Sequence, residues 1–139
     1  MRLARLLSAR PSTTVHSIFR NEAHIPEIAA TGAKPIVLSL EDASPGDFAE
    51  VFSNTRANVV YFSAGAGGKG GPERTKKVDQ EGAIKVFDAI ELVKEAERPR
   101  LIMVSAIDVR DPENIPEHYV RLQASPSSVD LLRVQQYAR

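Results

Sequence analysis

The chain has 139 residues, with 18 basic and 18 acidic side chains and therefore a formal net charge of zero. This balance argues against nucleic acid and anionic membrane surfaces as partners and favours a small molecule or a protein. The absence of cysteine excludes disulfides, thiolate nucleophiles and cysteine metal sites, and the three histidines are not spaced as metal ligands, so no metal site is expected.

The N-terminal segment, residues 1–21, is rich in arginine, serine and threonine and contains no acid. That composition is typical of a mitochondrial transit peptide, which stays as the alternative to the cytoplasmic location that we predict. We prefer to interpret the segment as a short helix with a buried stripe of Leu3, Leu6 and Leu7, followed by a strand. No apolar run approaches the roughly 20 residues that cross a bilayer, so a soluble protein is expected.

Short apolar strands alternate with helices along the chain, which is the pattern of right-handed β-α-β units on a parallel sheet. Helices are predicted over residues 25–29 and, most strongly, over residues 72–96. A further helix is expected to begin at Ser44, with Asp47 in its first turn. The predicted strands cover residues 14–20, 36–40, 58–63 and 101–106.

A glycine-rich segment follows the third predicted strand, and residues 65–70 match the pattern G-x-G-x-x-G. The acid that completes a dinucleotide fingerprint is not found, because Asp88 falls within a helix, and Lys69 is not followed by the serine or threonine of a P-loop. Small residues at the end of a buried strand still allow a flat or anionic group to lie against the backbone. A flexible glycine turn without a ligand is the alternative.

Several short motifs occur in a fixed order along the chain. They are residues 19–21, 38–42 and 63–75, the pairs Val78-Asp79 and Gly82-Ala83, and residues 102–106. Together they resemble an atypical short-chain dehydrogenase/reductase domain, most closely of the NmrA-like, NAD(P)-binding branch. The resemblance implies a doubly wound parallel sheet of the Rossmann type over residues 1–110. Residues 111–139 are then an irregular tail with a short C-terminal helix.

The resemblance also implies a cofactor and its binding residues. In that family the residue after the second strand selects the cofactor, and Arg20 stands where an acid would serve NAD. A guanidinium can hold a 2′-phosphate bidentately, so NADP is preferred over NAD. By the same resemblance Leu40 and Glu41 lie near the adenine, while the ribose and pyrophosphate pass along Ala64, Gly65 and Ala66. A solvated surface arginine is the alternative for Arg20.

Two further residues match family positions with known roles. Asp79 matches an aspartate or asparagine that supports the strand ends, and its alternative is an exposed helical acid. Ser105 closes the fourth predicted strand, where catalytic members carry a serine that orients the substrate carbonyl. A serine that satisfies only local backbone groups fits this position equally well.

The chain departs from the family pattern at both ends. The family opens with a strand and a glycine-rich turn that faces the pyrophosphate, whereas Met1 corresponds to the following helix. We therefore expect an incomplete fold that lacks this first strand and turn. Such a gap predicts either direct pairing of residues 14–20 with residues 58–63 or a marginally folded chain.

Catalytic relatives carry a tyrosine with a lysine four residues later, but Gln123 stands at that distance from Tyr119 and no lysine follows Tyr137. We therefore expect an NADP-binding domain that is inactive as it stands. It would be an oxidoreductase, transferring a hydride between NADPH and an unidentified carbonyl or alkene, only as part of a longer form. The alternatives are a non-catalytic NADP sensor that acts through a protein partner, and a truncated product without function.

Overall fold

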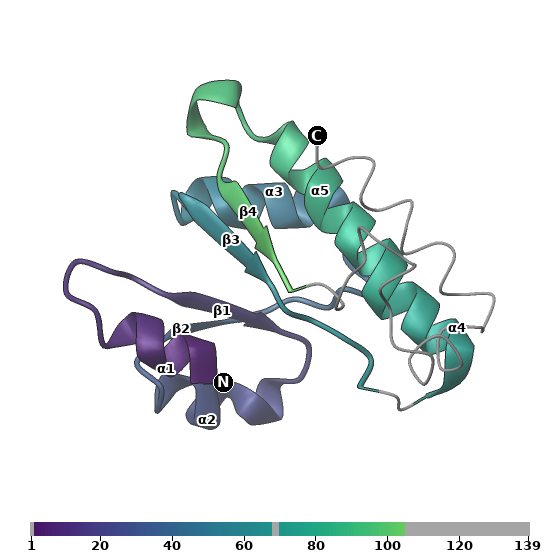
Figure 1. Ribbon diagram of the computed structural model, residues 1–139, viewed down its shortest axis with the longest axis horizontal. Coiled ribbons are helices and arrows are strands. Elements are labelled where there is room, and N and C mark those ends of the chain that lie inside the picture. Colours follow the sequence, from purple (N-terminus) through teal and green to yellow (C-terminus); the bar gives the residue numbers. More distant parts are fainter. Residues whose placement is uncertain (1, 68–69, 105–139) are drawn as a thin grey trace, which may run out of the picture. The chain divides into compact units, whose positions relative to one another are not determined.

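Two pairs of parallel strands, each connected through helices, make up the part of the chain that the structure describes (Figure 1). The computed structural model describes residues 2–67 and 70–104. They fall into two units, of which the first comprises Met1–Ala43 and the second begins at Ser44. The predicted α/β organisation with parallel strand pairing is confirmed in both units.

The first unit is built on β1 (His16–Phe19) and β2 (Lys34–Val37), which pair in parallel with Phe19 opposite Val37. The pairing continues beyond the strands, because the N–H of Leu38 donates to the carbonyl of Phe19 at 2.9 Å. The connection between the strands consists of η1 (Glu22–His24) and α2 (Ile25–Ala29). Gly32 ends this connection at a φ of +85°, the left-handed conformation expected of a glycine there.

The helix α1 (Arg2–Ser8) confirms the predicted N-terminal helix, but the prediction of a buried leucine stripe is wrong. Leu3 is 38% exposed and Leu6 is 69% exposed. The reason is that the first unit offers little apolar surface: among its described residues, Ile28 and Ala33 are the buried hydrophobic ones. Leucines at helical spacing therefore predict the helix, but not a surface that covers it.

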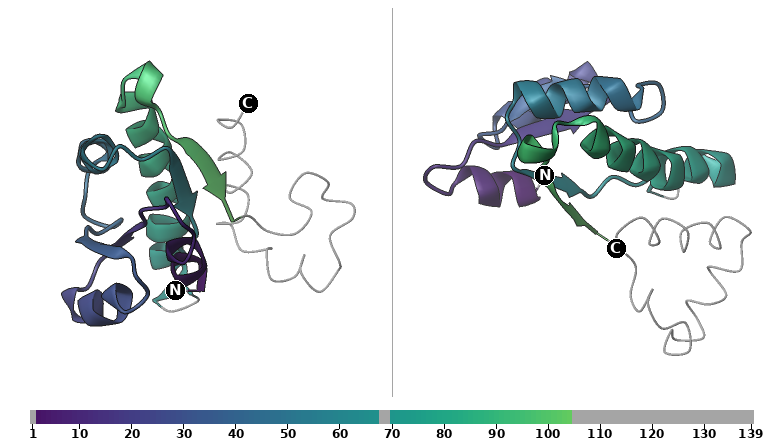
Figure 2. Two further views of the ribbon diagram at one scale, coloured as in Figure 1. Left: turned by 90° about the vertical axis from the view of Figure 1, so that its left-hand side faces the viewer. Right: turned by 90° about the horizontal axis from the view of Figure 1, so that it is seen from above.

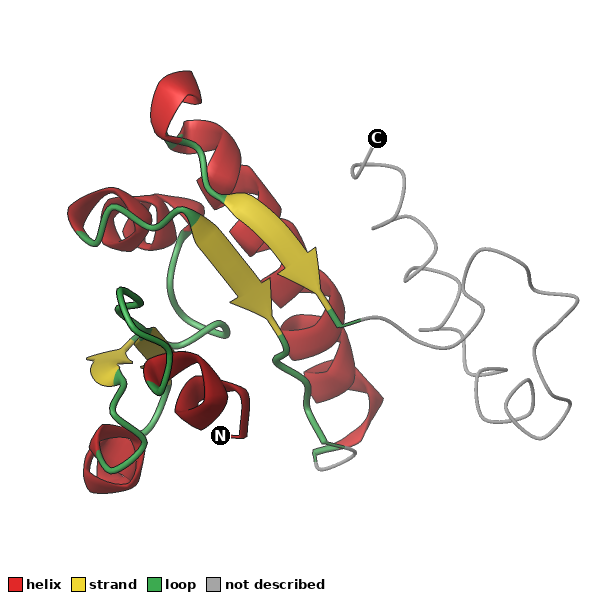
Figure 3. Ribbon diagram, turned by 60° about the vertical axis from the view of Figure 1, so that its left-hand side comes forward, coloured by secondary structure: helices red, strands yellow, loops and turns green. Residues whose placement is uncertain are grey.

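The second unit is built on β3 (Val59–Phe62) and β4 (Arg100–Met103), again parallel, with Phe62 opposite Met103. Before β3 lies α3 (Pro45–Asn54). Between β3 and β4 the chain forms α4 (Gly71–Thr75), η2 (Lys76–Glu81), α5 (Gly82–Leu92) and η3 (Glu95–Glu97). Figure 2 shows α3 and α5 side by side, and Figure 3 shows α5 crossing behind the two strands.

The core of the second unit lies between α3, α5 and the strands. Its centre is Phe48, which is 1% exposed and whose ring centroid lies 6.4 Å from that of Phe52. Among the described residues of this unit, the other buried apolar ones are Ala49, Phe62, Ala66, Val78, Ala83, Val86, Ala89 and Val93. Several of them come from the predicted apolar stripe of the long helix, so its inward face is confirmed.

The long helix differs from the sequence prediction in two ways. Its segment η2 is π-helical, since the N–H of Gly82 donates to the carbonyl of Lys77, five residues earlier. It also ends at Leu92 rather than near residue 96. The guanidinium of Arg98 donates from Nε to the carbonyl of Val93 at 3.1 Å and from Nη2 to that of Glu91 at 2.8 Å, and so satisfies carbonyls that a helix end leaves open.

Neither strand pair is the direct pairing of residues 14–20 with residues 58–63 that was one expectation for an incomplete sheet. Within the described ranges, no helix is long and apolar enough to cross a membrane. The predicted tail of residues 111–139 lies outside the described residues.

Candidate functional site

Arg20 and Glu41 form an ion pair beyond the carboxyl ends of β1 and β2. Nη1 of Arg20 donates to Oε1 of Glu41 at 2.6 Å, and the side chains are 55% and 26% exposed. Because the two strands are parallel and in register, the residues that follow them leave the pair at the same edge. Two residues that the resemblance assigns to the adenosine end of a cofactor are therefore in direct contact.

Short-range hydrogen bonds fix the backbone on both sides of this ion pair. After β2, the hydroxyl of Ser39 accepts from the N–H of Glu41 at 3.2 Å, and the carbonyl of Ser39 accepts from the N–H of Ala43 at 2.9 Å. After β1, the side chain of Asn21 accepts from the N–H of Ala23 at 3.0 Å and caps η1. The turn that holds Glu41 also holds Leu40, which is half-buried.

The segment after β3 presents backbone that is almost free of side chains. Ala64 and Gly65 are exposed. A Cβ built on Gly65 would meet one neighbouring atom within 4 Å, Oδ1 of Asp79 at 3.7 Å. A flat or anionic group can therefore approach the backbone here, as the sequence pattern predicts. Ala66 differs from its neighbours, because it is 6% exposed and part of the core.

Asp79 ties this segment to the helix. Its Oδ1 accepts from the N–H of Ala66 at 2.7 Å, across 13 positions of the chain. Asp79 therefore holds the segment that follows β3, four residues beyond the strand end at Phe62, and it is not merely an exposed helical acid. Asp79 lies in the π-helical η2, and π turns are frequent at functional sites. Because the N–H of Ala66 already donates to Asp79, it is not available to a ligand, and Ala66 contributes only its small size.

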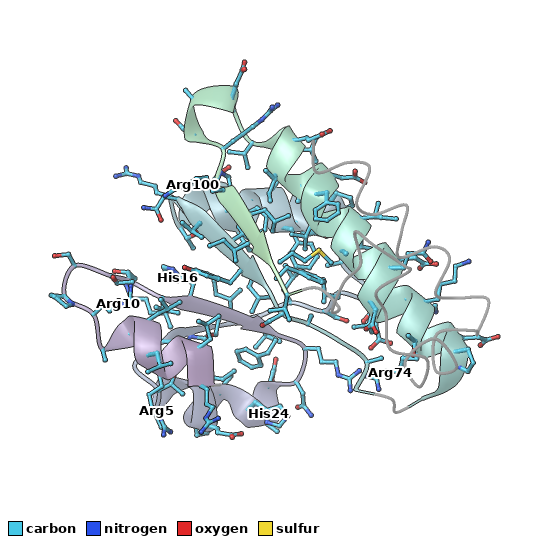
Figure 4. All side chains as sticks on the ribbon, viewed as in Figure 1. Arg5, Arg10, His16, His24, Arg74 and Arg100 are labelled. Carbon is cyan, nitrogen blue, oxygen red and sulfur yellow. The ribbon has the colours of Figure 1, made fainter. Side chains whose placement is uncertain are left out.

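The glycine segment enters α4 through Gly70, whose φ is +96°. A Cβ at this position would lie 2.5 Å from Cδ of Arg74, the residue labelled on α4 in Figure 4. The left-handed conformation favours glycine at this position, and a larger residue would also displace the side chain of Arg74.

His16 lies on β1 opposite Lys34 (Figure 4). Burial lowers the pKa of His16 from 6.5, and the positive charge of Lys34 lowers it further. The neutral imidazole is therefore favoured in the folded chain. Among residues 2–67 and 70–104, no group of three or more histidine, aspartate or glutamate side chains could hold a metal ion.

Ser105 is the one residue predicted to be catalytic, and it lies outside the described residues, as do Tyr119, Gln123 and Tyr137. The cofactor-binding candidates form two groups, one in each unit. Arg20, Leu40 and Glu41 belong to the first unit, and Ala64, Gly65 and Ala66 belong to the second. The sequence analysis missed two features of these groups: the pairing of Arg20 with Glu41 and the π turn that carries Asp79.

Residues 1–135 match the model of a family described as NAD(P)H-binding. The chain belongs to this NAD(P)H-binding family. The resemblance to a Rossmann-type dehydrogenase/reductase is thereby confirmed at the level of an NAD(P)-binding, Rossmann-like domain. A nicotinamide dinucleotide is accordingly the cofactor of the family, and the comparisons do not separate NADP from NAD.

Individual proteins agree with this assignment. The chain is 47% identical to a UPF0659 protein of Schizosaccharomyces pombe, over 76% of this chain and 41% of that protein. It is 32% identical to the uncharacterized sugar epimerase YhfK of Bacillus subtilis, over 95% of this chain and 64% of that protein. The structure resembles a Bacillus halodurans protein described as an NAD-dependent epimerase/dehydratase, with a TM-score of 0.71 and 26% identity, over 97% of this chain and 57% of that chain. The chain thus spans less than two thirds of the length of each.

Proposed function

We propose that the chain binds NADP(H) in preference to NAD(H), and that Arg20 holds the 2′-phosphate. The observation that carries this proposal is the contact between Arg20 and Glu41 at the carboxyl end of β1. The contact supports the proposal because the guanidinium, 55% exposed, already holds one oxyanion, the carboxylate of Glu41, at 2.6 Å. Ligands of open α/β sheets bind outside the carboxyl ends of the strands, which is where this arginine stands.

The other candidates have complementary parts in the proposal. In the first unit, Leu40 supplies apolar surface for the adenine beside Arg20, and in the second unit the bare backbone at Ala64 and Gly65 can be approached by a flat or anionic group. Asp79 keeps that backbone in place through Ala66. The nicotinamide, when bound, accepts or donates a hydride.

The choice between the two cofactors is the point most in need of a test. The description of the Bacillus halodurans protein names NAD. The argument for NADP comes from this chain's own Arg20, a residue that can bind phosphate bidentately. A carboxylate in that position would instead accept from the 2′-hydroxyl of NAD.

The test is calorimetric titration of the full chain with NADPH and with NADH, for the unsubstituted protein and for Arg20→Ala. We expect submillimolar binding of NADPH, weakened at least about tenfold by Arg20→Ala, with a smaller loss for NADH, because only NADPH carries the phosphate. Arg10→Ala is the matched control, since it removes another exposed arginine of the same unit. Equal losses for NADPH and NADH would contradict the role of Arg20.

The activity of the whole protein is a second part of the proposal. The name of YhfK and the description of the Bacillus halodurans protein refer to epimerase or dehydratase chemistry. We infer hydride transfer to or from an unidentified carbonyl or alkene in a longer protein, with Ser105 orienting the substrate. The alternative is a cofactor sensor that acts through a protein partner, which the missing lysine after Tyr119 favours. Binding without turnover of NADPH supports the sensor, and turnover supports the enzyme.

A further inference from the structure

The guanidinium of Arg20 has a partner before any cofactor arrives. Nη1 of Arg20 lies 2.6 Å from Oε1 of Glu41, a short, charge-assisted hydrogen bond. The carboxylate is the less exposed of the two, at 26% against 55% for the arginine side chain. Under the proposed function, a 2′-phosphate must therefore bind an arginine that is already paired.

The turn after β2 keeps Glu41 close to Arg20. The hydroxyl of Ser39 accepts from the backbone N–H of Glu41, and the carbonyl of Ser39 accepts from the N–H of Ala43. The carboxylate can leave the guanidinium by side-chain rotation, but the backbone at Glu41 stays beside the site. A phosphate bound to Arg20 would therefore keep a negative charge as its neighbour.

The charges around the Arg20–Glu41 ion pair disfavour binding of a phosphate beside Glu41. A phosphate monoester carries nearly two negative charges at neutral pH, whereas Arg20 supplies one positive charge. Glu41 cancels that charge in the free protein, and the next residue, Asp42, is also acidic and exposed. NAD lacks the 2′-phosphate, so its binding does not require Glu41 to release the guanidinium of Arg20.

We propose that Glu41 determines cofactor specificity by competing with the 2′-phosphate for Arg20, and so limits the preference for NADP over NAD. The proposal rests on the proposed function, because it assumes that Arg20 binds the phosphate. It gives Glu41 a second role beside the adenine contact that the family resemblance implies. NADPH must displace the carboxylate from the guanidinium, and NADH need not.

The experiment measures the dissociation constants of NADPH and NADH by calorimetry for the full chain, for Glu41→Gln and for Glu41→Ala. We expect both substitutions to tighten NADPH about twofold to fivefold relative to NADH, because the adenine contact of Glu41 is common to both dinucleotides and cancels in the ratio of their dissociation constants. Glu27→Gln is the matched control: it removes one negative charge from the same unit, but Glu27 pairs with His24 and not with Arg20. It is expected to leave the ratio of the two constants unchanged.

A double-mutant cycle separates competition from a general change of charge or shape. In the Arg20→Ala background, Glu41→Gln should tighten NADPH by a smaller factor, because it then relieves only charge repulsion and no longer removes a competitor for the guanidinium. If Glu41→Gln leaves the ratio of the NADPH and NADH dissociation constants unchanged or weakens NADPH, this inference is overturned. The proposed function stays intact as long as Arg20→Ala weakens NADPH more than NADH. Failure of the unsubstituted chain to bind either dinucleotide would overturn both.

Discussion

Asp79 holds the segment after β3 through a hydrogen bond from its carboxylate. Its carboxylate accepts from the N–H of Ala66 at 2.7 Å, and Ala66 is 6% exposed. Water cannot readily replace this acceptor, since a buried N–H without a partner costs about 1 to 3 kcal/mol. The segment therefore depends on a side chain from the helix for its conformation.

We predict that Asp79→Ala lowers the free energy of unfolding by about 1 to 3 kcal/mol, because the N–H of Ala66 is left without its acceptor. Asp79→Asn keeps an oxygen acceptor and should lose less. Urea denaturation followed by circular dichroism measures both. Asp88→Ala, which removes an exposed acid from α5, is the control. Similar losses for Asp79→Ala and Asp88→Ala would argue against the anchoring role.

Several residues of the candidate site could be predicted from the sequence, but not their contacts. Arg20, Glu41 and Asp79 were each identified from motifs in a fixed order. The contact between Arg20 and Glu41 was not predicted, because it joins residues 21 positions apart and depends on the register of β1 with β2 and on the Ser39 turn. Motifs report residue types, whereas a contact of this kind follows from how two strands end together.

Among the elements, α3 has the best defined beginning. The hydroxyl of Ser44 accepts from the N–H of Asp47 at 3.3 Å, and the carboxylate of Asp47 accepts from the N–H of Ser44 at 2.7 Å. This reciprocal pair satisfies backbone donors that a helix start leaves open. The hydrogen bonds from the backbone and hydroxyl of Ser44 lower the pKa of Asp47 from 3.8.

We predict that Ser44→Ala destabilises the chain by about 1 kcal/mol in thermal or urea unfolding, as loss of an N-cap side chain does. It should also raise the pKa of Asp47 back toward 3.8, which NMR titration measures. Because the folded pKa is depressed, the stabilisation from the Asp47 carboxylate is present above pH 3.8 and is lost as the pH falls through the lower folded value. Ser53→Ala, at an exposed position late in α3, is the control and should leave both quantities unchanged.

Element types were predictable to a larger extent than element ends. Apolar runs bounded by turn residues located all the described strands. The strand predicted over residues 36–40 begins two residues earlier, because Lys34 and Pro35 already pair with β1, and ends three residues earlier, at Val37. The end of α5 was misplaced because the carbonyls near Val93 are satisfied by Arg98, a contact across the turn that no periodicity reveals. The prediction that the α1 leucines are buried was wrong for a related reason. The pattern shows which face of the helix is apolar, but not which residues cover that face.

At the scale of the whole molecule, each unit has a single pair of strands within the described residues. Two-stranded sheets are marginal in water unless a helix or further strands cover them. The second unit has a core around Phe48, whereas the first has few buried apolar residues, Ile28 and Ala33. The boundary at residue 110 between a cofactor domain and a tail stays a prediction.

We therefore predict that a peptide of residues 1–43 does not fold by itself, because the apolar area it buries does not offset the loss of conformational entropy. Circular dichroism during heating should show a gradual change without a cooperative transition. The full chain under the same conditions is the comparison. A cooperative transition in the peptide alone would contradict the prediction.

The π turn at η2 has a consequence for how homologous sequences are aligned. A π turn holds one residue more than the α-helical turns around it, so deleting a residue between positions 76 and 81 would restore an ordinary helix. A residue turns the chain through a smaller angle in a π-helix than in an α-helix, so the side chains of α4 and α5 would keep their faces and those within the turn would move. In a relative with a one-residue gap here, an aspartate aligned with Asp79 lies within the turn, and its direction relative to the segment after β3 would change. Equivalence at this position therefore depends on the number of residues in the turn as well as on the presence of an acid.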